Sequence, residues 1–419
     1  MKKLFKIVTI VVLAIPVSLI AFSQSVKTPI PLEINGKIID FQCPNVAPVC
    51  YDLNKDGLND LIVGTYYGEF KYFENTGTNE KPLYKEPTFL KINGNIITVP
   101  MLFKRAVTPH FTDLNGDGNT DILCSTQGLI YVLYGNGNDS FNKPIALRDT
   151  SGGFVSMGLY HDPNTGSNKI DDHRLYYKDW RKVIDWINVA STVDWDNDGD
   201  LDLLLGAEKG LRGCINEGSK TKPEFNTKSF NIIRLKEQQA ENDKSYYLIN
   251  VITDWDGDGL WDLMGGNNAG GVYLFKNTGT IEKPSFSNVP TCLVKPDEIK
   301  NAKSFNHIAV TDYNNDGKKD ILIGVMIKEP NSTFTQEELQ KRKELEPLLD
   351  EIDKKIEERF DYIDENYTGK ERSNKLQNDS ALISYGQQYD KISRKVDTYK
   401  ESYGIGAGAY GKIFIAFGK

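Results

Sequence analysis

A nine-residue pattern occurs five times in this chain, with acidic or amide side chains at positions 1, 3, 5 and 9 and glycine at position 6. The copies begin at Asp52, Asp113, Asp194, Asp254 and Asp312, so successive copies start 61, 81, 60 and 58 residues apart. Ca²⁺ prefers six to eight oxygen ligands, and a tight loop whose alternate residues point inward supplies them. The pattern therefore predicts five calcium loops.

In each loop we expect the side chains at positions 1, 3, 5 and 9 and the carbonyl at position 7 to bind the ion. An EF-hand is excluded, because its glutamate at position 12 is missing from all five copies. A single copy could equally be a hairpin turn without metal, but five complete copies favour calcium. The expected ligands are Asp52, Asn54, Asp56, Leu58 and Asp60; Asp113, Asn115, Asp117, Asn119 and Asp121; Asp194, Asp196, Asp198, Asp200 and Asp202; Asp254, Asp256, Asp258, Leu260 and Asp262; and Asp312, Asn314, Asp316, Lys318 and Asp320.

The residues around each loop read as short β-strands. Position 9 opens an apolar run, as at 60–64, 202–206 and 320–324. A second landmark, an Asn-Gly or Asn-x-Gly turn with Lys-Pro after it, follows the first four motif starts by 22 or 23 residues. Each unit then contains four strands, which is one propeller blade. We therefore predict an all-β, five-bladed β-propeller with calcium loops.

These motifs resemble those of the FG-GAP or VCBS repeat proteins, whose similar calcium loops also occur in the propeller of integrin α subunits. The resemblance covers residues 30–330 and the last dozen residues. It implies a calcium-binding propeller, but the family includes adhesion modules, enzyme domains and proteins of unknown role, so it does not decide the function.

The two ends of the chain carry separate signals. Residues 1–23 combine three lysines with an apolar run, which is typical of a secretory signal peptide; the run is shorter than the ~20 residues of a membrane span. We expect residues 24–419 to form the mature, secreted propeller. Residues 411–417 match a third strand, and residues 32–39 resemble residues 90–97, which we expect to be the fourth strand of blade one. The N-terminus should therefore complete the last blade.

Two insertions interrupt the regular plan. Residues 150–187 lengthen the link between blades two and three, and residues 330–404 lie inside blade five. The second insertion begins with a capping box at Thr335 and Glu338 and has heptad-like apolar stripes over 345–363 and 382–403, which predict an antiparallel, coiled-coil helical hairpin. Its aromatic residues are expected to hold the two helices together. Strand direction places both insertions on the face opposite the calcium loops.

The first insertion has the composition of a recognition or catalytic loop. In a catalytic interpretation Asp171 or Asp172 is the acid/base, His173 shuttles a proton and Arg174 holds an acidic sugar or carboxylate. The simpler interpretation is a polar loop that folds over the disc. Further residues that could face a ligand are His161, Tyr176 and Trp180.

Composition limits the remaining choices. A net charge of -8 argues against nucleic acid as a partner. Five cysteines are too few for a disulfide scaffold, although Cys43 and Cys50 could bridge in an oxidising compartment. Cys124, Cys214 and Cys292 fall in apolar runs and are expected to be buried, and the tryptophans of the calcium loops (Trp195, Trp255 and Trp261) are expected to serve blade packing. No nucleophile elbow, phosphate loop or zinc motif is present. We therefore expect a binding or scaffold module for glycan or protein, with a polysaccharide lyase as the alternative.

Overall fold

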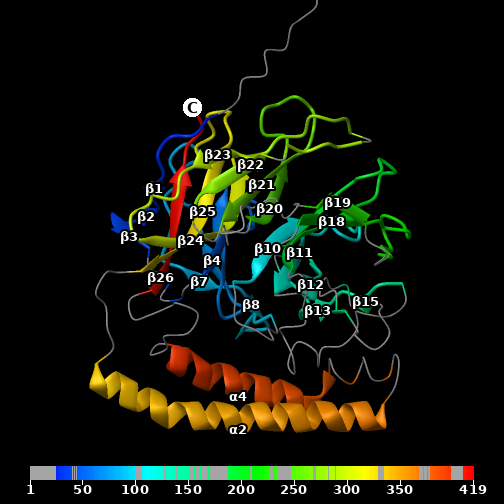
Figure 1. The fold of residues 1–419 in the computed structure, drawn as a ribbon, viewed down its shortest axis with the longest axis vertical. Coiled ribbons are helices and arrows are strands. Elements are labelled where there is room, and N and C mark those ends of the chain that lie inside the picture. The colour runs from blue at the N-terminus through cyan, green and yellow to red at the C-terminus, as the bar shows by residue number, and fades with distance from the viewer. Residues whose placement is uncertain are drawn as a thin grey trace, which may run out of the picture.

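The computed structural model is a five-bladed β-propeller with an inserted pair of helices (Figure 1). It describes residues 25–99, 106–150, 187–234, 247–328, 335–397 and 409–419, apart from short gaps of up to three residues within these ranges, and in addition residues 155, 160–161 and 168–169. The predicted signal peptide at 1–23 lies outside the described residues. No helix in the described part of the chain is long and apolar enough to cross a membrane.

Each blade is a four-stranded antiparallel sheet, and the five sheets share one plan. Blades one and two contain β4 (Val46–Tyr51), β5 (Asp60–Thr65), β6 (Phe70–Phe73) and β7 (Thr88–Phe89), then β10 (Thr108–Thr112), β11 (Asp121–Thr126), β12 (Leu129–Leu133) and β13 (Ile145–Ala146). Blades three and four contain β16 (Ile187–Val193), β17 (Asp202–Ala207), β18 (Gly210–Cys214) and β19 (Phe230–Arg234), then β20 (Tyr247–Thr253), β21 (Asp262–Asn267), β22 (Val272–Phe275) and β23 (Thr291–Val294). Blade five contains β24 (Ala302–Thr311), β25 (Asp320–Lys328), β26 (Ala409–Ala416) and β1 (Ile30–Pro31).

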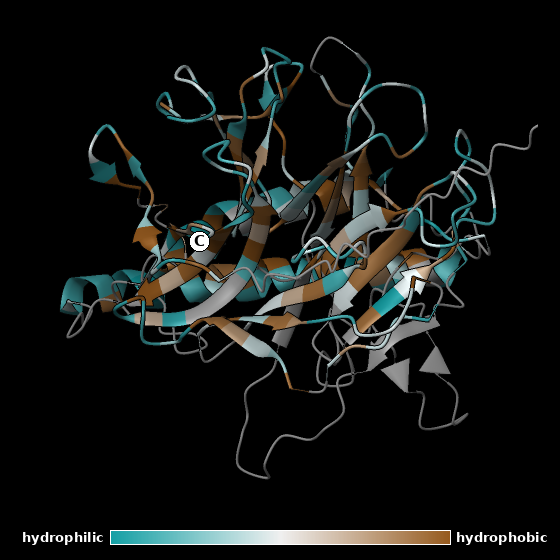
Figure 2. Ribbon diagram, turned by 90° about the horizontal axis from the view of Figure 1, so that it is seen from above, coloured by the Kyte–Doolittle hydropathy of each residue, from teal (hydrophilic) through white to brown (hydrophobic). Residues whose placement is uncertain are grey.

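The hydrophobic core fills the spaces within and between neighbouring blades, and Figure 2 shows the apolar residues concentrated on the strands. The second strands are almost wholly buried, which explains their continuous apolar runs. Gly64 in β5 allows the next blade to approach closely, because a Cβ at this position would lie 1.8 Å from the carbonyl oxygen of Val107. The glycine that ends each apolar run in the sequence thus has a packing role at this site.

The termini close the ring, as predicted, but with different residues. β1 pairs with β26 through Ile30 and Ile415, and the N–H of Leu32 donates to the carbonyl of Ile413. Residues 33–38 instead form a small hairpin of β2 (Glu33–Ile34) and β3 (Lys37–Ile38).

The prediction that residues 90–97 form the fourth strand of blade one was wrong, because most of these residues also form a small hairpin. β7 is the fourth strand, and residues 91–96 form a hairpin of β8 (Lys91–Ile92) and β9 (Asn95–Ile96). Asn93 and Gly94 both have positive φ, as a tight two-residue hairpin turn requires. The similarity between the two segments is real, but it is a shared Asn-Gly hairpin.

The second insertion forms two helices between β25 and β26: α2 (Gln336–Asn366) and α4 (Ser380–Asp397). The predicted capping box at Thr335 and Glu338 is present. Apolar side chains hold the helices together, which confirms the expectation for the aromatic residues; this cluster is Ile352, Ile356, Phe360, Leu382, Tyr385, Tyr389 and Ile392. The predicted stripe beyond residue 397 lies outside the described residues.

The helical hairpin lies along the side of the propeller away from the C-terminus (Figure 1) and is fastened to blade one. Arg394 of α4 donates to both carboxylate oxygens of Glu69, at 3.2 and 2.6 Å, and its guanidinium lies 4.4 Å from the centre of the Tyr67 ring. Glu69 is buried, and Tyr67 lies in the turn between β5 and β6. The helical hairpin therefore contacts the propeller as well as packing its two helices together.

None of the five cysteines, all of which lie among the described residues, forms a disulfide, so the bridge that Cys43 and Cys50 could make is not present. Burial raises the pKa of Cys50 to about 12, so this thiol stays protonated at neutral pH. Cys292 is exposed, which corrects the expectation that it is buried.

Candidate metal centres

The five acidic loops, here called loop one (52–60), loop two (113–121), loop three (194–202), loop four (254–262) and loop five (312–320), connect the first and second strands of the blades. The carboxylate at position 1 stabilises the turn by accepting hydrogen bonds from the backbone. In loop one the carboxylate of Asp52 accepts from the N–H groups of Asp56 and Gly57, at 3.1 and 2.9 Å. Loops two, three and five repeat these two hydrogen bonds. The loops thus have the same conformation at their start.

Position 5 binds the backbone of position 7 in every loop. The Asp56 carboxylate accepts from the N–H of Leu58 at 2.9 Å, and the equivalent bonds in the other loops measure 2.8–3.0 Å. In loop one the amide of Asn54 also donates to Asp56, at 3.0 Å. Side chains at positions 1, 3 and 5 therefore converge, as a cation site needs.

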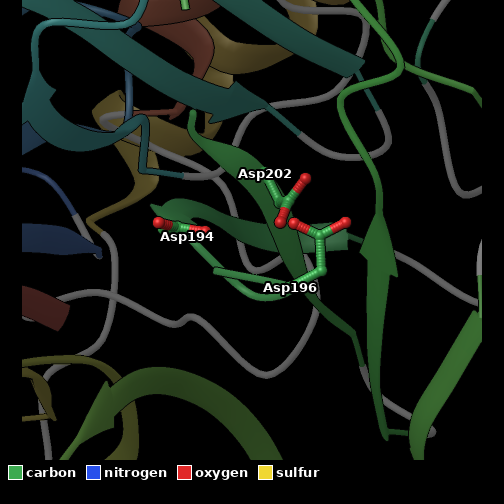
Figure 3. Close-up of side chains that lie close together, drawn as sticks. All are labelled: Asp194, Asp196 and Asp202. Atoms are coloured by element: carbon green, nitrogen blue, oxygen red, sulfur yellow. The ribbon is translucent and has the colours of Figure 1, made fainter. Parts of the chain in front are cut away.

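Two loops have aspartate at position 3 and collect three carboxylates. Oxygens of Asp194, Asp196 and Asp202 all lie within 4.8 Å of one another (Figure 3), and the same positions of loop four form a second such group. At position 3 of loops four and five, Asp256 Oδ1 and Asn314 Oδ1 are buried and have no hydrogen-bond partner. A divalent cation would satisfy these oxygens, so the donor set fits calcium.

Position 9 has a second role that the sequence pattern did not reveal. One oxygen of Asp202 accepts from the N–H of Trp195 at 2.8 Å, and the other accepts from the N–H of Asn216 at 2.7 Å. All five loops repeat this bridge. Position 9 thus ties its loop to the end of the third strand of the same blade.

The bridging carboxylates are buried, and burial raises their pKa values. The pKa values of Asp121 and Asp262 rise to about 6, although the backbone N–H donors oppose the shift. A nearby cation would stabilise the charged form of each carboxylate and so lower its pKa again.

The Asn-Gly landmark connects to the same bridge. Asn75 donates its N–H to Asp60 at 2.8 Å, and its side-chain oxygen accepts from Gly77 and Leu83, both at 3.0 Å. Asn216 and Asn277 repeat these contacts. In blades one, three and four the two sequence landmarks are therefore one hydrogen-bonded unit.

A central cavity of about 290 Å³ lies between the first strands of all five blades. His110 and His307 line it, together with Thr192 and the indole of Trp261. His110 Nε2 accepts from the N–H of Thr192 at 3.3 Å, and burial lowers the pKa of this imidazole to about 4. Among the described residues that line this cavity, none carries a carboxylate, ammonium or guanidinium group.

The tryptophans of the loops differ in burial. Trp255 is almost fully buried in the core, as expected, and Trp195 is partly buried against its neighbours. Trp261 is 42% exposed, so the expectation that it serves blade packing was wrong. At position 8 of loop four, its indole reaches the central cavity.

The predicted catalytic residues cannot be placed in this geometry. Residues 171–174, Tyr176 and Trp180 lie outside the described residues, while His161 belongs to a short strand, β14 (Tyr160–His161), that pairs with β15 (Asn168–Lys169). The central histidines were not predicted as a pair, because only the closed ring brings blades two and five to one cavity.

No curated protein matches the sequence of this chain. Similar solved structures include a lectin of Agrocybe aegerita that recognises non-reducing terminal N-acetylglucosamine, with 16% identity, a TM-score of 0.31, and coverage of 71% of this chain and 79% of the lectin. A GH62 hydrolase in complex with xylotriose is 11% identical, with a TM-score of 0.40 and coverage of 74% and 93%. BBS1N in complex with ARL6DN is 13% identical, with a TM-score of 0.32 and coverage of 74% and 84%. These similarities are too weak to identify a function.

The family model of the FG-GAP-like repeat matches residues 254–323, a segment that begins with loop four and contains loop five. Both loops have the geometry described above, and three further copies of it occur in the chain. This protein therefore contains FG-GAP-like repeats, in agreement with its resemblance to the FG-GAP/VCBS repeat family.

Proposed function

We propose that this protein is a secreted, calcium-stabilised β-propeller that serves as a binding module for glycan or protein. The observation that supports the proposal is which groups the described acidic side chains of the loops contact. Those of the five loops bind backbone N–H groups and surround candidate cation sites. The central cavity has no carboxylate among its described lining residues. This arrangement favours a rigid binding scaffold over acid/base chemistry at the propeller centre.

Calcium would be held by the side chains at positions 1, 3, 5 and 9 and the carbonyl at position 7. The positive charge of the ion would offset the repulsion between the carboxylates of one loop. The chain's own residues prepare each loop for the ion: position 1 closes the turn, and position 9 fixes the loop to the third strand. We assign the ion a structural role because these contacts lie within single blades.

A glycan screen of the purified protein tests the proposal. Binding without turnover is the expected result, and the same incubations are followed by the absorbance of unsaturated sugar products. Product formation would favour the lyase alternative, with its site in the insertion at 150–187. An Asp171→Asn/His173→Ala double variant would then be expected to lose turnover and keep the melting temperature of the parent.

A further inference from the structure

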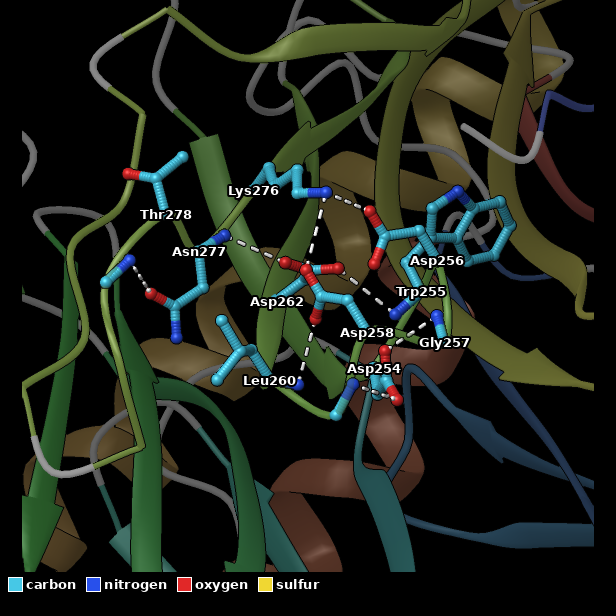
Figure 4. A network of polar contacts seen from close by, with 12 residues as sticks. Asp254, Trp255, Asp256, Gly257, Asp258, Leu260, Asp262, Lys276, Asn277 and Thr278 are labelled. Atoms are coloured by element: carbon cyan, nitrogen blue, oxygen red, sulfur yellow. Dashed lines mark hydrogen bonds and ion pairs between the residues drawn. The ribbon is translucent and has the colours of Figure 1, made fainter. Parts of the chain in front are cut away.

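In loop four a lysine reaches the carboxylates of positions 3 and 5 (Figure 4), a contact that no other loop has among the described residues. Lys276 follows β22, and its Nζ contacts Asp256 at position 3 and lies 3.4 Å from Asp258 at position 5. The side chain of Asp256 is only 5% exposed, whereas that of Lys276 is 37% exposed. The pair is therefore better shielded from water than an ordinary surface ion pair.

The equivalent position in the other blades is not basic. It is the residue before the one whose N–H binds position 9, and it is Glu74, Tyr134, Ile215 and Phe417 in blades one, two, three and five. Loop three is the informative comparison, because it also has aspartate at positions 3 and 5 but has Ile215 in place of the lysine. The lysine is thus a feature of one loop and not of the repeat.

An ammonium at these carboxylates supplies the positive charge that a metal ion would otherwise supply. Ca²⁺ entering loop four must displace the ammonium from Asp256 and Asp258 or bind beside a like charge. Calcium affinity follows the charge of the ligand set, so a resident cation lowers it. Loop three has five aspartates, at every odd position, and Asp200 Oδ1 at its position 7 is buried without a partner.

We infer that Lys276 is a built-in counter-ion that makes loop four a weak calcium site, while loops one, two, three and five bind calcium tightly. This inference rests on the calcium role proposed above. Asp256 Oδ1, which is buried and has no hydrogen-bond partner, leaves loop four able to bind the ion weakly. Loop four then fills last, at calcium concentrations at least about tenfold higher than the other loops need.

The experiment is a calcium titration of the purified full chain, with CaCl₂ as the probe, followed by isothermal titration calorimetry and native mass spectrometry. The parent protein is expected to bind four calcium ions tightly and a fifth weakly. Lys276→Met should bind five tightly, and Lys276→Arg, which keeps the charge, should behave as the parent does. Ile215→Lys places a lysine in loop three and is expected to convert one tight site into a weak one.

Melting curves provide an independent readout. Lys276→Met should melt at a lower temperature than the parent in EDTA, where its carboxylates have no counter-ion, and should recover at saturating calcium. If Lys276→Met does not fold without calcium, Lys276→Gln replaces it in the titration. Five equal sites in the parent, unchanged in the Lys276 variants, would overturn the inference alone. A parent protein that binds no calcium would overturn the proposed metal role as well.

Discussion

Replacing Asp202 with alanine is expected to destabilise the propeller even when no calcium is bound. Asp202 is 1% exposed and accepts backbone N–H bonds from Trp195 at 2.8 Å and Asn216 at 2.7 Å. A hydrogen bond to a charged group contributes about 1.5–3 kcal/mol, and the variant also leaves two donors without their acceptor. Removal of the buried carboxylate, whose pKa is raised by burial, returns part of this energy. We expect a net loss of about 3 kcal/mol in the free energy of unfolding.

Asp196→Ala is the matched control, because Asp196 belongs to the same loop and carboxylate group but is exposed. It should lower the free energy of unfolding in calcium and leave it nearly unchanged in EDTA. The assay is urea unfolding of both variants and the parent, each measured in EDTA and in millimolar calcium. The bridge at position 9 would be refuted if Asp202→Ala matched the parent in EDTA. Equal losses for both variants in EDTA would refute the distinction between position 9 and position 3.

Four further predictions follow from the same structure. Chelation with EDTA should lower the melting temperature, because each site filled at 100 times its Kd contributes about 2.7 kcal/mol; an unmoved curve and no metal by elemental analysis would contradict the calcium loops. The pKa of His110 falls from 6.5 to about 4 on folding, so the unfolded chain binds the extra proton between these pH values and stability should decrease as pH falls through them. At ~1.4 kcal/mol per pKa unit this is about 3 kcal/mol between pH 7 and 4, and urea unfolding of His110→Gln should lack this part of the pH dependence. Arg394→Ala removes the arginine that pairs with the buried Glu69 carboxylate and should lower the free energy of unfolding by about 1–2 kcal/mol. Proteolysis of the helical hairpin should then be faster, and unchanged cleavage would mean that this ion pair does not attach the hairpin to the propeller. Deleting residues 24–40 exposes the edge of β26 and should cause aggregation in light scattering; a stable monomer would refute closure by the termini.

The blade plan could be predicted because its signals are local. Positions 1, 3, 5 and 9 fall within nine residues, and the second strand follows directly as a buried apolar run. Glycine at position 6, such as Gly57 at φ 88°, adopts a backbone conformation that few other residues accept. The helical hairpin was predictable for the same reason, since the capping box at Thr335 and Glu338 and a periodic stripe are short-range patterns.

The features that were missed depend on contacts between distant segments. Arg394 and Glu69 are 325 residues apart, and neither lies in a motif that indicates the other. The small hairpin at residues 91–96 was missed although its Asn-Gly turn is local, because its apolar residues also fit a fourth strand, and only the pairing of β7 with β6 shows which segment fills that place. Lys276 precedes a recognised landmark and could have been noticed as the one basic residue at that position, but its distance to Asp258 required the fold.

The bridge at position 9 holds each loop in shape without a cation, because both of its donors are backbone N–H groups of the same blade. Each bridge uses backbone donors from two parts of a blade, so the carboxylate is fixed before any ion binds. A site that is fixed in advance loses little conformational freedom when calcium enters, which favours affinity. Within a loop the carboxylate at position 9 is repelled by those at positions 3 and 5, as Asp202 is by Asp196 and Asp198, so the metal-free propeller carries electrostatic strain in its loops. Calcium in this protein would thus act on a framework that is already formed, and its main effect would be on stability.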